Sequence, residues 1–306
     1  MRDFDRPIQS MQQAESAELD WGEKEWGTHR YHTRQLLEHA MEASSVLDRA
    51  AVLGAGNHGG VNLPQLARGF AQLTVLDTEA NSIEEVLEQS GLGATANVKT
   101  LTNVDYTCLD QLNFYETWED MLLNHTSAAD IACYIKDCAF EARRHEALPH
   151  LKQSFDLVVS CSVHTQLFYI HALSQFAGYA PQYAEADIRQ IVDTLSYLRN
   201  SLVEDYNRLL SSLLRPDGRL VMWSDMIRLS DENEQLLEQL YSLNSEQARI
   251  KFLFRAFGQH GIEPAVLGLK DLHDRVKQEN QLFKCWVWLA DKDKRYIAAG
   301  FSGRLR

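Results

Sequence analysis

The chain has 306 residues, of which 45% are hydrophobic and 24% are charged, and its formal net charge at pH 7 is −13. This length and apolar content allow a large hydrophobic core, which argues against disorder across the body of the chain. The acidic balance argues against nucleic-acid binding, which needs clustered lysine and arginine. We therefore expect a small molecule or a protein as substrate, and no RNA or DNA partner.

The cysteines and the polarity of the N-terminus indicate a cytoplasmic protein. The five cysteines are odd in number and include no C-x-x-C pair, so neither a disulfide framework nor a zinc site is predicted. The N-terminus is largely polar and has no apolar segment of the secretory type. No apolar run approaches the roughly 18 residues of a membrane span, so we expect no membrane partner.

Residues 1–46 predict a helical segment that precedes the sheet, with apolar side chains at helical spacing around Leu36 and Ala40. Large aromatic side chains lie near it: Trp21, Trp26 and Tyr31. Two interpretations stay open. The aromatic side chains pack the helix onto the sheet, or the segment covers a cofactor and forms one wall of a substrate pocket.

The next segment has the pattern of a nucleotide-binding βαβ unit. A strand at 50–54 opens into a glycine-rich turn, a helix follows at 63–71, and a second strand at 73–77 ends on Asp77. Glycine lets a ligand approach main-chain N–H groups closely, and a carboxylate at the next strand end can accept both hydroxyls of a ribose. Together they predict a bound nucleoside.

The sequence then alternates between helical and strand patterns. Ser82 and Glu85 predict an N-cap with a capping box for the next helix. We expect a third strand at 98–104 and a fourth at 155–160. The fourth is continuously apolar, which is typical of a central parallel strand.

The C-terminal half predicts two helical insertions and a closing hairpin. A long helix is expected at 181–213, and charged helices at 229–280. Between them, a turn at 215–218 leads into a fifth strand at 219–223. A β-hairpin, with strands at 283–290 and 295–301, ends the sheet with an antiparallel strand. The predicted fold is α/β: a Rossmann-like, seven-stranded, mostly parallel sheet with helices on both faces.

Two features favour a single nucleoside over a dinucleotide, although Gly54, Gly56 and Gly59 satisfy the pattern G-x-G-x-x-G. Pro64 fits only the first turn of a helix, so the glycines line an extended loop rather than the helix start. A dinucleotide site instead sets its third glycine inside the helix. The antiparallel hairpin also differs from the all-parallel dinucleotide fold.

The ordered motifs resemble those of class I S-adenosylmethionine-dependent methyltransferases. The resemblance rests on 52–56, Asp77, Asp105, 155–160 and 214–221, and it covers about residues 46–305. More narrowly, the segment after strand four looks like a poorly characterised bacterial branch of that superfamily. The resemblance implies a methyltransferase domain at 47–306, which residues 1–46 cover.

The resemblance implies that S-adenosylmethionine is held by ten residues: Gly54, Ala55, Gly56, Asn57, Asp77, Thr78, Asp105, Tyr106, Ser160 and Cys161. The glycine turn approaches the methionyl part with its backbone, and Asp77 holds the ribose. Asp105 and Tyr106 meet the adenine, by accepting its amine and by stacking. Ser160 and Cys161 end strand four at the reacting centre. His58 replaces the usual third glycine of the loop, which leaves the loop path open.

His164 is the candidate general base, because it follows the end of strand four and imidazole titrates near neutral pH. The alternative is that His164 caps or packs a helix. Methyl transfer needs a base only when the acceptor must lose a proton. No cluster of acids typical of a metal-dependent methyltransferase is apparent, so no metal is expected.

The sequence therefore predicts an S-adenosylmethionine-dependent methyltransferase that acts on an oxygen or nitrogen of a small molecule. Transfer of the aminocarboxypropyl group by the same fold is the nearest alternative. A non-catalytic protein that binds S-adenosylmethionine is another, and an NAD-dependent oxidoreductase is a more distant one. Acceptor identity and oligomeric state stay open.

Overall fold

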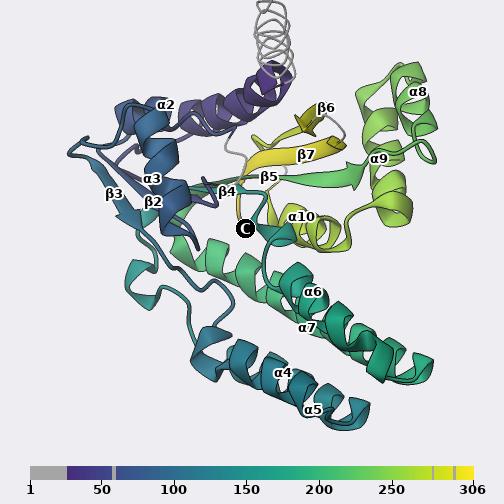
Figure 1. Cartoon of the computed structure of the whole chain (residues 1–306). Helices are drawn as coiled ribbons and strands as arrows, with labels where there is room; N and C mark the ends of the chain where they lie inside the picture. The colour runs from purple at the N-terminus through teal and green to yellow at the C-terminus, as the bar shows by residue number, and fades with distance from the viewer. Residues whose placement is uncertain (1–25, 57–59, 278, 292–293) are drawn as a thin grey trace, which may run out of the picture.

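The computed structural model describes residues 26–56, 60–277, 279–291 and 294–306. At its centre lies a seven-stranded sheet in the order β3-β2-β1-β4-β5-β7-β6 (Figure 1). The strands are β1 Arg49–Leu53, β2 Gln72–Leu76, β3 Val98–Leu101, β4 Phe155–Cys161, β5 Leu214–Arg228, β6 Leu282–Asp291 and β7 Lys294–Arg304.

Strands β1 to β5 run parallel, and β7 is antiparallel to both of its neighbours. All seven residues of β4 are buried, as its continuous apolar pattern predicts for a central strand. The parallel strands all end at one edge of the sheet, which is where ligands bind in open α/β folds. The predicted fold class is confirmed.

Helices cover both faces of the sheet. Successive residues of a strand point to opposite faces, so one strand contributes side chains to the core on each face. Ala50 and Val52 belong to one core cluster, together with the helix over 26–42, α2 Leu63–Gly69 and α3 Ala80–Gln89. Ala51 and Leu53 belong to the other. That second cluster includes side chains of four helices: α7 Glu185–Leu213, α8 Gln235–Ser242, α9 Glu246–His260 and α10 Glu263–Arg275.

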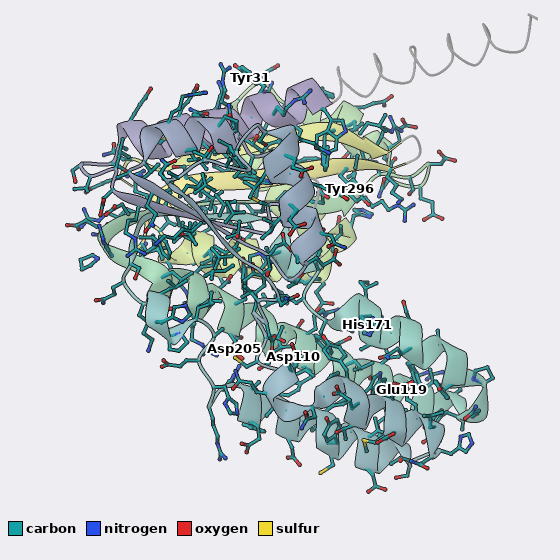
Figure 2. All side chains as sticks on the ribbon, turned by 60° about the vertical axis from the view of Figure 1, so that its left-hand side comes forward. Tyr31, Asp110, Glu119, His171, Asp205 and Tyr296 are labelled. Carbon is teal, nitrogen blue, oxygen red and sulfur yellow. The ribbon has the colours of Figure 1, made fainter. Side chains whose placement is uncertain are left out.

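A helical layer with its own apolar core projects from the sheet (Figures 1 and 2). It consists of α4 Phe114–Leu123, α5 Ala128–Ala142, α6 Tyr169–Tyr179 and the first half of α7. The fully buried Trp118 and Phe114 lie at its centre. Because α7 runs on into the sheet core, one continuous helix joins the two parts of the molecule.

Three local expectations differ from the structure. Helix α3 begins at Ala80 after Glu79, with no side-chain cap, so Ser82 is not an N-cap; its hydroxyl donates to Glu79 Oε2 over 3.0 Å. Strand β3 is shorter than predicted and ends at Leu101. The turn at 215–218 is an irregularity inside β5, where Asp217 adopts a φ of 71°.

No helix in the described ranges is long and apolar enough to span a membrane.

Candidate active site

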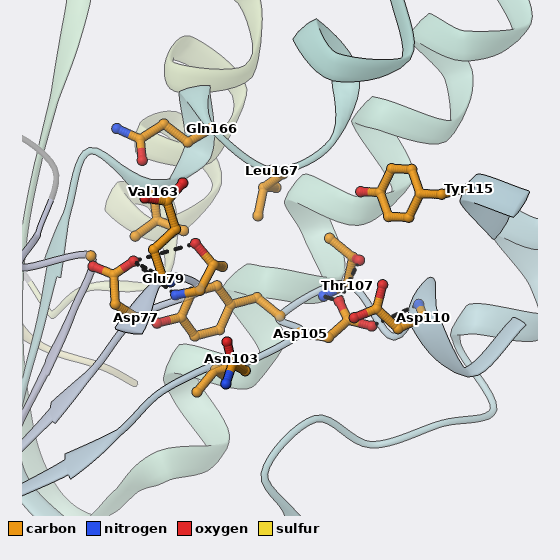
Figure 3. A pocket seen from close by; sticks show the side chains of 14 residues that line it. Asp77, Glu79, Asn103, Asp105, Thr107, Asp110, Tyr115, Val163, Gln166 and Leu167 are labelled. Carbon is orange, nitrogen blue, oxygen red and sulfur yellow. Dashed lines mark hydrogen bonds between the residues drawn. The ribbon is translucent and has the colours of Figure 1, made fainter. Parts of the chain in front are cut away.

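A cavity of about 530 Å³ opens at the carboxyl edge of the parallel strands (Figure 3). Its lining comes from the glycine turn, from the loops after β2, β3 and β4, and from α4: Gly54, Asp77, Thr78, Glu79, Asn103, Val104, Asp105, Tyr106, Thr107, Asp110, Tyr115, Val163, Gln166 and Leu167. A cavity of this size holds an ordinary cofactor or small molecule. The structure thus brings the predicted glycine turn and Asp77 to one site.

Gly54 sits where the turn meets the strand ends, and only glycine fits there. Its φ is +76°, and its N–H donates to the Leu76 carbonyl over 3.0 Å. A Cβ at this position would lie 2.6 Å from Val163 Cγ2 and 2.7 Å from the Cys161 carbonyl. The turn therefore packs directly on the end of β4 and leaves its backbone beside the cavity.

Asp77 lies just past the end of β2, with 1% of its surface exposed. Its Oδ2 accepts a hydrogen bond from the Gly56 N–H over 3.0 Å, and its Oδ1 accepts one from the Thr78 N–H over 2.8 Å. These bonds tie the carboxylate to the glycine turn. A carboxylate oxygen can accept two hydrogen bonds, and in the described part of the chain only the Gly56 N–H donates to Oδ2, so this oxygen has capacity for a ligand hydroxyl.

Asp105 organises the loop after β3. Its Oδ1 accepts hydrogen bonds from the Thr107 N–H at 2.7 Å and from the Thr107 hydroxyl at 2.6 Å, and its Oδ2 accepts one from the Asp110 N–H at 2.9 Å. Burial and the nearby Asp105 and Glu116 carboxylates raise the pKa of Asp110. Asp105 therefore holds a loop that lines the cavity, and its predicted contact with adenine stays a prediction.

Tyr106 is 5% exposed and lines the cavity. Its hydroxyl has no hydrogen-bond partner among the described residues. Burial, with smaller contributions from Tyr206 and Asp77, raises its pKa well above the ordinary value, so the phenol is neutral and can donate. The ring meets Tyr206 edge to face at 5.6 Å. The hydroxyl is buried beside the Gly54 backbone, so Tyr106 shapes the cavity wall, and its predicted contact with adenine stays a prediction.

The two predicted residues at the end of β4 lie beneath the site rather than in its lining. Ser160 is fully buried, and its hydroxyl shares a 2.8 Å hydrogen bond with the Tyr206 hydroxyl. Cys161 is 1% exposed, and burial raises the pKa of its thiol well above the ordinary value. Both side chains support the floor of the cavity. Their contact with a cofactor stays a prediction.

His164 also lies behind the cavity wall. It is 1% exposed, and its Nε2 is 2.7 Å from Asn207 Oδ1. The Asn207 amide donates to the Gly268 carbonyl and to Asp271, which orients its Oδ1 as acceptor and makes His164 Nε2 the donor. Burial lowers the pKa of His164 to about 4. The structure places the imidazole among α7 and α10, and its role as a base stays a prediction.

The remaining predicted residues are divided between lining, core and undescribed positions. Thr78 lines the cavity, and Ala55 is buried in the core beneath the turn. Gly56 contributes its N–H to Asp77. Asn57 and His58 lie outside the described residues. In the described part of the chain, no group of three or more acidic, histidine or cysteine side chains is arranged to hold a metal.

Nine of the fourteen residues that line the cavity were not among the predicted site residues. Glu79, Asn103 and Thr107 follow the strand ends that carry Asp77 and Asp105, so their closeness to those acids was the available signal. Tyr115 on α4 and the apolar Leu167 carry no such signal, because their helix and loop reach the cavity only through tertiary packing. Figure 3 shows Tyr115 and Leu167 on the side of the cavity opposite Asp77.

Comparison with known proteins gives similarities of fold only. No protein-family model matches the chain, and no curated protein matches it. The similar solved structures include the N-methyltransferase NodS from Bradyrhizobium japonicum, at 12% identity over 90% of this chain and 97% of that chain, with a TM-score of 0.38. The YcgJ protein from Bacillus subtilis is 10% identical over 90% and 99%, with a TM-score of 0.36.

Spermidine synthase from Thermotoga maritima is also similar, at 8% identity over 89% of this chain and 58% of that chain, with a TM-score of 0.38. One of these similar solved structures is thus named as a methyltransferase. At such identities and TM-scores, the similarity assigns neither a substrate nor a residue role.

Proposed function

We propose that this chain is an S-adenosylmethionine-dependent methyltransferase that transfers the methyl group to an oxygen or nitrogen of a small molecule. The observation that carries the proposal is the arrangement of Gly54 and Asp77. The acid after β2 is hydrogen-bonded to the glycine turn after β1, and both residues line one cavity at the carboxyl edge of the sheet. This is the arrangement expected for holding a nucleoside.

The residues present fit this cofactor in charge and in hydrogen-bonding capacity. Four carboxylates line the cavity, on Asp77, Glu79, Asp105 and Asp110, and the lining residues that the structure describes include no lysine, arginine or histidine. Such a site favours a cation over an anion. Among the described residues, Asp77 Oδ2 accepts one hydrogen bond, from the Gly56 N–H, which leaves it capacity to accept one from a nucleoside hydroxyl.

The bound cofactor supplies an activated methyl group, so the chain needs chiefly to bind and align the two reactants. Gly54 provides close approach of the backbone, and Asp77 provides a buried acceptor. Tyr115 and Leu167 stand on the opposite side of the cavity, where they can restrict access of water. A general base is required only for an acceptor that must lose a proton, such as a hydroxyl or an ammonium group.

We further propose that residues 1–46 cover the site and that 47–306 form the methyltransferase domain. The described part of the N-terminal helix contacts the glycine loop directly. The Thr33 hydroxyl donates to the Gly60 carbonyl over 2.7 Å, and Trp286 Nε1 donates to His29 Nδ1 over 3.0 Å. These contacts support an N-terminal helix that holds one end of the loop in place.

Titration calorimetry with S-adenosylmethionine and with NAD tests the choice of cofactor. We expect saturable binding of S-adenosylmethionine alone. Replacing Asp77 by alanine should weaken that binding by about tenfold or more, because a charged acceptor is lost. Asp120→Ala on the exposed face of α4 is the matched control and should leave affinity unchanged. Near-normal affinity in Asp77→Ala would falsify the ribose site.

Product analysis separates the reaction types. Incubation with S-adenosylmethionine and a pool of small acceptors should release S-adenosylhomocysteine, which marks methyl transfer. Methylthioadenosine would instead mark transfer of the aminocarboxypropyl group. Binding without either product, across amine, hydroxyl and carboxyl acceptors, would support a non-catalytic role.

A further inference from the structure

We propose that the edge of β6 that pairs with no described strand binds an extended segment of a partner protein in which acidic and apolar residues alternate. The proposal concerns a surface separate from the cavity described above. It rests on the length of this edge, on the two walls beside it, and on basic side chains that have no acidic partner.

Strand β6 is the outermost strand of the sheet and is 10 residues long, whereas β3 at the other edge has 4 residues (Figure 1). An outer strand presents backbone N–H and C=O groups that an added strand can pair with. Native proteins usually shorten or cover such an edge. The length of β6 therefore indicates a surface suited to addition of another strand.

A groove with a volume of about 350 Å³ lies along this edge, and its walls stand on both faces of the sheet. Trp286 and Lys284 project to the face of the N-terminal helix, where the His32 ring stacks on Trp286 at 5.3 Å. Phe283 and Val287 project to the other face. There the wall is apolar and is formed by side chains of α8 and α9: Leu240, Tyr241, Ile250 and Leu253.

Lys284 makes the face of the N-terminal helix basic, whereas the other face is apolar except at its rim, where Arg249 of α9 donates from Nε to the Leu243 carbonyl over 2.9 Å. Lys284 is half-buried. Burial chiefly lowers the pKa of His32, and the charge of Lys284 lowers it further. Across the described ranges, neither Lys284 nor Arg249 forms a salt bridge, whereas arginines such as Arg143 and Arg275 pair with carboxylates. In a chain of net charge −13, two basic side chains that have no carboxylate partner among the described residues attract acidic side chains to this strand.

An added strand sends alternate side chains to opposite faces. Acidic residues would then meet Lys284, and apolar residues would meet Ile250 and the half-buried Phe283. The exposed Tyr241 and Arg249 stand at the rim. A second copy of this chain fits less well, because pairing two β6 edges about a two-fold axis brings identical basic surfaces together.

Fluorescence anisotropy tests the proposal with a labelled peptide as long as β6, in which valine and glutamate alternate. We expect saturable binding to the full chain. Lys284→Glu and Arg249→Glu should each weaken it by about tenfold, because an attraction becomes a repulsion. Lys270→Glu on the exposed side of α10 is the charge-matched control and should bind as the parent chain does.

A peptide of the same composition, with the valines and glutamates in two separate blocks, should bind at least about tenfold more weakly, because it cannot match both faces. Equal binding of the two peptides, absence of binding, or indifference to both charge reversals would overturn the proposal. So would sedimentation showing a dimer that Lys284→Glu dissociates, since a second copy would then occupy the edge. Unchanged S-adenosylmethionine affinity in Arg249→Glu keeps this test independent of the proposed function.

Discussion

Gly54 meets two constraints at once. Its φ of +76° belongs to the left-handed region, and the space where a Cβ would lie is filled by Val163 and by the Cys161 carbonyl. The first constraint is a matter of backbone strain, and the second is a matter of packing between β1 and β4. Both follow from the close contact of the glycine turn with the strand ends.

Replacing Gly54 by alanine should separate these two effects when it is compared with Gly91→Ala. Gly91 has a φ of +68°, and its Cβ position has open space around it. We expect Gly91→Ala to lower the free energy of unfolding by about 1 kcal/mol, from strain alone. Gly54→Ala should lower it by about 3 kcal/mol or more, because overpacking is added. Urea unfolding measures both, and equal losses would contradict the packing argument.

The place of Asp105 at the cavity could be predicted from the sequence, whereas its role in holding the loop after β3 could not. Its place after β3 predicts contact with adenine, yet in the structure both oxygens already accept hydrogen bonds from its own loop. Aspartate side chains often accept a hydrogen bond from the main-chain N–H two residues further along the chain, as Asp105 does from Thr107. The loop, in turn, sets the positions of Thr107 and Asp110 at the cavity.

At the scale of elements, the N-terminal helix is joined to β6 and to the glycine loop by a small number of buried polar contacts. His29 is 1% exposed, stacks on Trp288 at 4.1 Å and accepts a hydrogen bond from Trp286 Nε1. Trp288 Nε1 donates to Asp225 over 2.8 Å. Trp26, one of the aromatic residues near the start of the chain, packs at the edge of this cluster, and its ring centroid lies 5.1 Å from that of Trp288.

The Trp286 hydrogen bond should be measurable against a tryptophan that makes none. Trp118 is fully buried, and its Nε1 has no partner in the described structure. Trp286→Phe and Trp118→Phe remove similar volume, but only the first removes the donor of a buried hydrogen bond, the one to His29 Nδ1. We expect Trp286→Phe to cost about 1–3 kcal/mol more in the free energy of unfolding. Losses of equal size in denaturant titrations would argue against a role for this bond.

At the scale of the whole molecule, a buried network connects the turn after β4 to two helices. His164 bonds Asn207 on α7, and Asn207 bonds Asp271 on α10. Since α7 also reaches the projecting helical layer, this network lies where the sheet, the layer and the C-terminal helices meet. Among the described residues of this network, only His164 has a strongly lowered pKa.

The stability of the molecule should therefore depend on His164 at acid pH. The pKa of His164 is about 4 in the folded chain, against an ordinary value of 6.5, so the unfolded chain binds more protons between these values. The free energy of unfolding should fall by about 3 kcal/mol as the pH drops from 7 to about 3, with little further change from this group below that.

His164→Gln lacks the titrating group, so its stability should decline less over the same pH interval. Urea unfolding of the parent chain and the variant at several pH values measures the difference between the two slopes. Parallel slopes would show that protonation of His164 does not limit stability, whatever the absolute cost of the substitution.

The sequence alone determined the order of elements and the type of sheet. Apolar continuity in β4, the glycine turn and the terminal hairpin are local patterns, and each is set by backbone geometry over a few residues. Asp77 could be predicted for the same reason, because the ends of neighbouring parallel strands meet at one edge of a sheet. The half of the site that lies at these strand ends could therefore be predicted from the sequence.

Only the tertiary structure decided what completes the site and what lies behind it. Tyr115 and Leu167 reach the cavity because the helical layer packs against the sheet, and His164 is turned away because Asn207 and α10 hold its ring. These contacts join residues distant in the chain, and no local periodicity encodes them. Local patterns specify the strand ends, whereas long-range packing decides which side chains face the cavity between them.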